Sequence, residues 1–306
     1  MTFAIETHDL TRHFGRTEAV KNLTLRVPAG SVFALLGPNG AGKTTTLKLL
    51  MNLLRASGGT ATVLGIDSRR LDVRHLQRIG YVSENQRLPD WMTPSELFDY
   101  CRPFYPTWDE GLRRRLESDL ALASDTRLRT LSRGTRMKAA LLASLAYRPD
   151  LVILDEPFTG LDPMVRDELI RMLVDVSGDR PSTILISSHD VDEVERLADW
   201  VGFMSEGRFQ FAEPVPGLLG RFRMVEVIGT GDAPPAMPAD RHWIPQGSAG
   251  RTLRFVDTRH DHPEAAARVA AAFPGCDIQT FPLSLREIFL ILARSPSPAA
   301  DAREES

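Results

Sequence analysis

The stretch GPNGAGKT, residues 37–44, constrains the fold of this chain more than any other part of the sequence. It matches the spacing G-x-x-x-x-G-K-S/T in full, with an apolar run before it and a segment of helical spacing after it. Gly37, Gly40 and Gly42 permit backbone angles that a side chain would forbid, so consecutive N–H groups can turn toward one chain of phosphates. We therefore predict a strand, a phosphate-binding loop and a helix that together bind a nucleoside triphosphate.

Two side chains at the end of this loop suit such a ligand. The ammonium of Lys43 can reach the β and γ phosphates, and the hydroxyl of Thr44 is a hard oxygen ligand for Mg²⁺. The residues expected to bind the nucleotide here are Gly37, Pro38, Asn39, Gly40, Ala41, Gly42, Lys43, Thr44 and Thr45.

Two later apolar strands predict a hydrolytic site. The run LVILDEP brings Asp155 and Glu156 to the carboxyl end of a strand, where open α/β sheets build their sites. Asp155 is a candidate to hold Mg²⁺ through water, and Glu156 to orient and polarise an attacking water. The run STILISSHD delivers His189 to the end of an expected neighbouring strand, within reach of a γ-phosphate. An acidic pair or a lone histidine is more often structural, and the phosphate loop is what favours catalytic roles for Glu156, His189 and Lys43.

The order of the apolar patterns predicts two domains. Antiparallel strands in the first 30 residues are followed by strands alternating with helices, the last of these helices at 190–199, which implies an α/β fold with a parallel sheet. A turn-rich stretch near residue 215 precedes a small β-α-β-α unit. We expect domains at 1–215 and 216–294, and a disordered polar tail at 295–306.

Bulk properties exclude several classes of protein. A net charge of −3 over 306 residues argues against a nucleic-acid binder, which usually has a basic excess. Cys101 and Cys276 lie far apart, which favours two reduced thiols in a cytoplasmic protein over a disulfide or a zinc site. No stretch approaches the ~18 apolar residues of a membrane helix, and the N-terminus does not read as a signal peptide. Any membrane role is therefore expected to come through a partner.

Five motifs occur in order: GPNGAGKTTT, LSRGT, LVILDEP, TGLD and ISSHDVDEVERLAD. Together they resemble the ATP-binding subunits of ABC transporters over about residues 1–215. The resemblance implies a P-loop NTPase cassette with a mixed β-sheet core, an antiparallel β subdomain and a helical subdomain at about 85–148, followed by a small α+β domain. The runs WMTPSEL, FYPTWD and LSLREIFLILA look like the ABC-2-type exporter group.

The resemblance implies an ATPase that uses ATP and Mg²⁺, works as a head-to-tail dimer and powers a separate membrane permease. The dimer is a homodimer or pairs with a paralogous cassette, and the chain is attached to the membrane only peripherally, through its permease. The aromatic-rich region 85–118 is the expected permease contact, although several of its aromatics will form a helical core.

The resemblance also implies roles for residues outside the strands. Ser132 and Gly134, in the signature segment LSRGT, would close over the γ-phosphate held by the other subunit. Phe14 stands where the family usually has an aromatic that stacks on adenine, and Glu84 where it usually has a glutamine that contacts Mg²⁺. The full set implied in this way is Phe14, Glu84, Ser132, Arg133, Gly134, Thr135 and Asp162, with Thr44, Asp155 and Glu84 as the metal ligands.

The signature segment raises a question of charge. Arg129, Arg133, Arg136 and Lys138 crowd the start of an expected helix, whose first turn already carries partial positive charge. A phosphate from a second subunit would supply the missing negative charge at that helix start. We predict that this conflict is relieved only in the ATP-bound dimer.

Other ATPases with these motifs remain as alternatives. A chromosome-associated ATPase would insert a long coiled coil between the phosphate loop and the signature, and fewer than 100 residues intervene here. A translation-associated member would usually carry two cassettes, and this chain carries one. A nucleotide-regulated switch without transport stays open.

Overall fold

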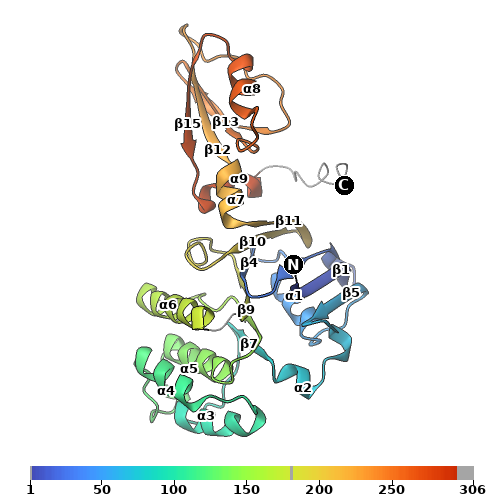
Figure 1. Cartoon of the computed structure of the whole chain (residues 1–306), viewed down its shortest axis with the longest axis vertical. Helices are drawn as coiled ribbons and strands as arrows, with labels where there is room; N and C mark the ends of the chain where they lie inside the picture. Colours follow the sequence, from blue (N-terminus) through green and yellow to red (C-terminus); the bar gives the residue numbers. More distant parts are fainter. Residues whose placement is uncertain (1, 180–181, 295–306) are drawn as a thin grey trace. The chain divides into compact units, whose positions relative to one another are not determined.

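The computed structural model describes residues 2–179 and 182–294 and divides into two compact units, residues 1–212 and 213–306 (Figure 1). The tail expected to be disordered, residues 295–306, lies outside the described residues.

A six-stranded sheet forms the centre of the first unit. Its strand order is β11 (Arg208–Pro214), β10 (Trp200–Ser205), β4 (Val32–Leu36), β9 (Thr183–Ser188), β8 (Leu151–Asp155) and β7 (Ile79–Ser83). The strands from β10 to β7 pair in parallel, and β4, β8 and β9 are buried along their whole length. Such continuous burial is typical of a parallel sheet covered on both faces. The expected parallel α/β core is confirmed, and its carboxyl edge carries the ends of β4, β8 and β9.

A second, antiparallel sheet comes from the N-terminal part of the same unit. It contains β1 (Phe3–Phe14), β2 (Thr17–Leu23), β3 (Arg26–Pro28), β5 (Gly58–Val63) and β6 (Ile66–Asp67). Strand β1 pairs antiparallel with β2, β3 and β5. The alternating pattern of the first 30 residues is therefore correctly assigned to antiparallel strands.

The helices of the first unit lie between these strands in the sequence. They are α1 (Lys43–Leu50), α2 (Val73–Leu76), α3 (Pro94–Cys101), α4 (Glu110–Asp119), α5 (Arg133–Leu145) and α6 (Pro163–Asp179), with short 3-10 turns η1 (Ser68–Arg70), η2 (Arg102–Phe104) and η3 (Leu128–Thr130). Helices α3 and α4 both contact α5 (Figure 1), and Phe98, Leu112 and Leu141 on these three helices are buried. These helices form the helical part of the unit.

The segment 190–199 forms successive turns and not the helix that its spacing predicts. The side chain of Asp190 accepts a hydrogen bond from the backbone N–H of Asp192 at 3.1 Å, and the Ser188 hydroxyl accepts one from the N–H of Asp190 at 3.0 Å. Short polar side chains that bind the nearby backbone in this way compete with the helix.

The second unit is a four-stranded antiparallel sheet with order β13-β14-β12-β15. Its elements are α7 (Val215–Arg221), β12 (Arg223–Ile228), β13 (Trp243–Ala249), β14 (Thr252–Asp257), α8 (Ala265–Ala272), β15 (Asp277–Pro282) and α9 (Leu285–Arg294). Trp243, Phe255 and Phe273 pack together in its core. The expected β-α-β-α order is found from β14 to α9, but the sequence analysis missed β12 and β13.

Candidate functional site

A cavity of about 460 Å³ opens at the carboxyl edge of the parallel sheet. Its lining residues are Ala19, Asn39, Gly40, Ala41, Gly42, Lys43, Thr44, Thr45, Glu84, Glu156, Thr159 and His189. Most of the predicted loop residues and all three predicted catalytic side chains, Glu156, His189 and Lys43, therefore meet in one place. Gly37 and Pro38 contribute through their carbonyl oxygens, which accept hydrogen bonds from Lys43 Nζ at 2.7 and 3.2 Å.

The loop between β4 and α1 needs glycine for two separate reasons. Gly40 and Gly42 have φ of 81° and 101°, in the region that side chains disfavour. A Cβ on Gly42 would also lie 2.4 Å from the carbonyl oxygen of Ala19. The loop is thus packed backbone to backbone against the N-terminal strands, and there is no room for a side chain at Gly42.

Thr44 and Asp155 place two hard oxygens side by side. Thr44 Oγ1 donates to Asp155 Oδ1 at 2.8 Å, and Ser187 Oγ donates to the same oxygen at 2.9 Å. Asp155 is only 5% exposed, because it ends the buried strand β8. Nothing in the sequence motif singled out Ser187, whose position on β9 orients the Asp155 carboxylate.

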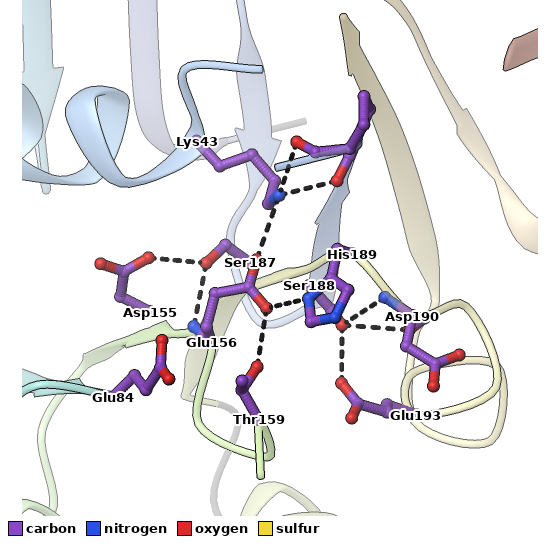
Figure 2. Close-up of polar contacts among 12 residues, drawn as sticks. Lys43, Glu84, Asp155, Glu156, Thr159, Ser187, Ser188, His189, Asp190 and Glu193 are labelled. Carbon is purple, nitrogen blue, oxygen red and sulfur yellow. Dashed lines mark hydrogen bonds and ion pairs between the residues drawn. The ribbon is translucent and has the colours of Figure 1, made fainter. Parts of the chain in front are cut away.

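Glu156 is the centre of a polar network at the cavity wall (Figure 2). One carboxylate oxygen lies 3.0 Å from Lys43 Nζ, and the other lies 2.7 Å from His189 Nδ1. Thr159 Oγ1 donates to that second oxygen at 3.1 Å. Sequence analysis missed Thr159, since one hydroxyl after an acidic pair carries no pattern of its own. The three contacts fix the carboxylate of the predicted catalytic residue inside the cavity.

The backbone at Glu156 adopts an unusual conformation. Its φ is 51°, in the left-handed region that costs a non-glycine residue about 1–2 kcal/mol. Its N–H bonds Ser187 Oγ at 3.1 Å and the Ser187 carbonyl oxygen at 3.2 Å, so neighbouring strand β9 holds the turn. Strain that the surroundings maintain is found preferentially at functional sites.

Opposing effects set the pKa of Glu156. Burial raises the pKa of this carboxyl, but the hydrogen bond with His189 and the ammonium of Lys43 together outweigh burial. The net pKa is therefore lowered from the usual value of 4.5, and Glu156 is ionised at neutral pH. An ionised carboxylate is the form that can accept a proton from water.

This lowered pKa predicts how the stability of the chain depends on acid. Because the pKa of Glu156 is lower in the folded chain than in the unfolded chain, its ionised form stabilises the fold above pH 4.5. That contribution is lost as pH falls through the folded pKa. We expect the difference in unfolding free energy between the parent and Glu156→Gln to be constant from neutral pH down to about 5 and to shift in favour of the variant at lower pH. Urea unfolding over this range measures it, and parallel pH curves for the two proteins would contradict it.

The signature segment lies outside the cavity of its own chain. Ser132 caps α5, and its Oγ accepts a hydrogen bond from the N–H of Thr135 at 3.1 Å. Gly134 is packed so closely on α6 that a Cβ there would lie 3.0 Å from Val165 Cγ1. Asp162 accepts hydrogen bonds from the N–H groups of Met164 and Val165 at the start of α6. None of Ser132, Arg133, Gly134 and Thr135 is among the residues that line the cavity.

Two of the four basic residues near this helix start are already paired within one chain. Arg133 Nη2 lies 2.7 Å from Glu84 Oε1, and Lys138 Nζ lies 2.5 Å from Glu168 Oε2. The prediction that the charge conflict is relieved only in an ATP-bound dimer is therefore wrong. Acidic side chains distant in the sequence supply part of the negative charge.

Phe14 ends strand β1 and is 44% exposed. The guanidinium of Arg12 lies over its ring at 4.5 Å from the centroid. Phe14 is not among the residues that line the cavity. Its role at an adenine ring stays a prediction.

Comparison with known proteins matches residues 20–159 to a family model described as ABC transporter. The daunorubicin/doxorubicin resistance ATP-binding protein DrrA of Streptomyces peucetius is 33% identical, over 99% of this chain and 96% of its own length. The bacitracin transport ATP-binding protein BcrA of Enterococcus faecalis is 32% identical over 68% of each chain. The Nod factor export ATP-binding protein I of Burkholderia lata is 36% identical over 70% of this chain and 72% of its own.

Solved structures show the same fold. An ATP-binding subunit of an ABC transporter aligns with a TM-score of 0.64 and 25% identity, over 71% of this chain and 92% of its own. The protein cbiO1 of Clostridium perfringens, part of the complex cbiONQ, aligns with a TM-score of 0.61 and 26% identity, over 70% of this chain and 89% of its own.

Proposed function

The chain belongs to the exporter-type ATP-binding proteins of ABC transporters, and on that premise we propose that Glu156 is the catalytic base of its ATPase site, in a dimer that drives a separate membrane permease. The observation that supports this assignment is the contact of Glu156 with Lys43 and His189 at the wall of the cavity that the phosphate loop lines. The carboxylate is ionised, fixed and next to the position where the loop would hold phosphate.

We propose that the neighbouring side chains bind the phosphates and the metal ion. Lys43 is placed to bind the β and γ phosphates, and His189 to hold Glu156 in orientation and contact the γ-phosphate. We propose that Thr44 and Asp155 hold Mg²⁺, with Glu84 as a further oxygen ligand, since magnesium is usually bound by few protein oxygens together with substrate phosphates and water. The adjacent oxygens of Thr44 and Asp155 fit this donor set. Mg²⁺ would supply neutralisation of the charge that develops on the phosphates.

The position of the signature segment supports a head-to-tail dimer. The cap of α5 is a helix N-terminus of the kind that binds anions, yet it does not face the cavity of its own chain. We propose that Ser132 and Gly134 contact the γ-phosphate held by a second subunit, either a second copy or a paralogous cassette.

A groove beside the helical part of the chain supports a permease contact. It has a volume of about 800 Å³ and lies between residues 83–91 and the first turns of α5. Trp91 lines it and is 68% exposed, and exposed aromatic side chains of this kind are enriched at protein interfaces. Among the described residues, no helix has the length and hydropathy of a membrane span. We propose that the chain attaches peripherally to the cytoplasmic side of the membrane through this groove.

The names of the relatives are relevant to the transported cargo and to the alternative function, an ATPase switch without transport. Their names refer to an anthracycline, to bacitracin and to a Nod factor, which differ widely in chemistry. We propose that the permease selects the cargo. The relatives compared give no support to a translation- or DNA-associated switch.

Replacing Trp91 with alanine is expected to weaken membrane attachment by about tenfold or more. A tryptophan that becomes buried when two proteins bind often contributes much of the binding energy. The measurement is the fraction of tagged chain that sediments with membranes from the source cells. Leu53→Ala is the matched control, since Leu53 is 59% exposed but does not line the groove. A parent chain that does not sediment, or equal sedimentation of both variants, would count against the permease contact.

A further inference from the structure

Two of the residues given roles by the resemblance, Glu84 and Arg133, contact each other. Glu84 stands where the family usually has a glutamine, and its Oε1 accepts a hydrogen bond from Arg133 Nη2 at 2.7 Å. The two side chains are 29% and 44% exposed. A neutral substitution of either residue would leave the other without this ionic partner, so the two side chains form one unit.

This ion pair connects two parts of the first unit. Glu84 follows β7, and its N–H donates to the carbonyl oxygen of Asp155 at 2.9 Å, which anchors it to the parallel sheet. Arg133 is the first residue of α5, directly after Ser132. The pair therefore ties the signature segment to the edge of the sheet that carries Asp155 and Glu156.

Arg133 has a second contact on the same side. A Cβ built on Gly160 would lie 3.0 Å from Arg133 Nη1, so the guanidinium lies close against the backbone of the segment between Glu156 and Asp162. Gly160 has φ of 71° and lacks a side chain that would displace Arg133. Arg133 is thus held by its own chain on two sides.

Glu84 also lines the nucleotide cavity, together with Lys43 and Glu156 (Figure 2). A triphosphate that enters this cavity brings several negative charges close to the Glu84 carboxylate. Repulsion between these charges, or the use of Glu84 as a metal ligand, weakens the hold of Glu84 on Arg133. The ion pair is consequently sensitive to the occupancy of the cavity in its own chain, while Arg133 belongs to the segment proposed to serve the cavity of the partner.

We propose that the Glu84–Arg133 ion pair is a latch that holds the signature segment to the sheet in the nucleotide-free chain and opens when nucleotide enters the cavity of the same chain. Occupancy of one site thereby prepares the segment that completes the other site. The latch rests on the proposed ATP-driven dimer for its function, but the ion pair itself exists within a single chain. Partly exposed ion pairs of this kind shift an equilibrium by about 2- to 5-fold, so the latch adjusts closure and does not forbid it.

Hydrogen–deuterium exchange of residues 131–137 in the nucleotide-free, full-length chain tests the latch without any dimer. Arg133→Ala is expected to speed exchange of this segment about 2- to 5-fold, and Glu84→Gln to do the same. The double variant is expected to match the single variants, because both remove one interaction. Arg136→Ala is the control, since it removes the same charge from the same helix. Unchanged exchange in Arg133→Ala, or additive effects in the double variant, would overturn the latch.

Dimerisation supplies a second readout. In a Glu156→Gln background, Arg133→Ala is expected to lower the ATP concentration for half-maximal dimerisation by about 2- to 5-fold, whereas Arg136→Ala does not lower it. A higher ATP requirement in Arg133→Ala would mean that Arg133 binds the phosphate held by the partner. An unchanged requirement would mean that the ion pair has no effect on dimerisation. Either result overturns the latch. If the Glu156→Gln chain itself does not dimerise with ATP, the proposed dimer fails while the exchange experiment still decides whether the pair restrains the segment.

Discussion

Glu156→Gln is expected to lower the rate of ATP hydrolysis by about 10² to 10⁴ while ATP still binds. Glutamine keeps the size of the side chain and can still bond Thr159, but it cannot accept the proton of an attacking water. Phosphate release under saturating ATP measures the rate, and a fluorescent ATP analogue measures binding. Since bound ATP persists in this variant, a dimer should accumulate with ATP and Mg²⁺, visible by size-exclusion chromatography with light scattering.

A matched control for this variant is Glu226→Gln on strand β12 of the second unit. Glu226 is ion-paired with Arg254 at 2.7 Å, so the substitution also removes one paired carboxylate. We expect it to leave the hydrolysis rate unchanged. Parent-like hydrolysis by Glu156→Gln would show that the base lies elsewhere, and the absence of any dimer would argue against the proposed sandwich.

Lys43→Met is expected to reduce the affinity for ATP by about 100-fold or more, and hydrolysis with it. The side chain of Lys43 is 5% exposed, and its ammonium lies 3.0 Å from a carboxylate oxygen of Glu156 in the cavity. Truncating one partner of a buried, hydrogen-bonded charge pair costs about 2–5 kcal/mol, which corresponds to this loss of affinity. Methionine retains the length and the apolar part of the side chain, so the effect is on binding more than on packing.

Lys48→Met on the same helix α1 is the control for Lys43→Met, because it removes the same charge outside the cavity. Isothermal titration calorimetry with a non-hydrolysable ATP analogue measures the nucleotide affinity of both variants. Circular dichroism confirms that the variants are folded. An affinity for ATP in Lys43→Met within a factor of three of the parent would contradict the role given to Lys43.

The part of the site that sequence predicts well is the part carried by local patterns. The phosphate loop is one continuous stretch between a strand and a helix, and Asp155 and Glu156 end a strand of unbroken apolar character. Because parallel strands end at a common edge, the pattern alone implies that these groups lie close together. The parallel core follows from unbroken apolar runs, and the antiparallel N-terminal strands follow from alternating apolar and polar positions.

The parts that sequence analysis missed depend on contacts between distant positions. The partners of Arg133 and Lys138 lie on other elements, and no spacing rule connects Glu84 or Glu168 with α5. The segment 190–199 has helical spacing, yet the side chain of Asp190 binds the backbone and favours turns. Strands β12 and β13 were missed because a turn-rich insertion separates them and hides their antiparallel relationship through β14.

The ammonium of Lys43 connects the phosphate loop with the carboxylate of Glu156. This ammonium bonds the carbonyl oxygens of Gly37 and Pro38 and forms an ion pair with the carboxylate of Glu156. If phosphate oxygens take over the bonds of Lys43, as proposed, His189 and Thr159 still hold the Glu156 carboxylate in place. The phosphate loop and the Glu156 carboxylate are thus linked through one ammonium, and we expect a bound triphosphate to change the contacts of both.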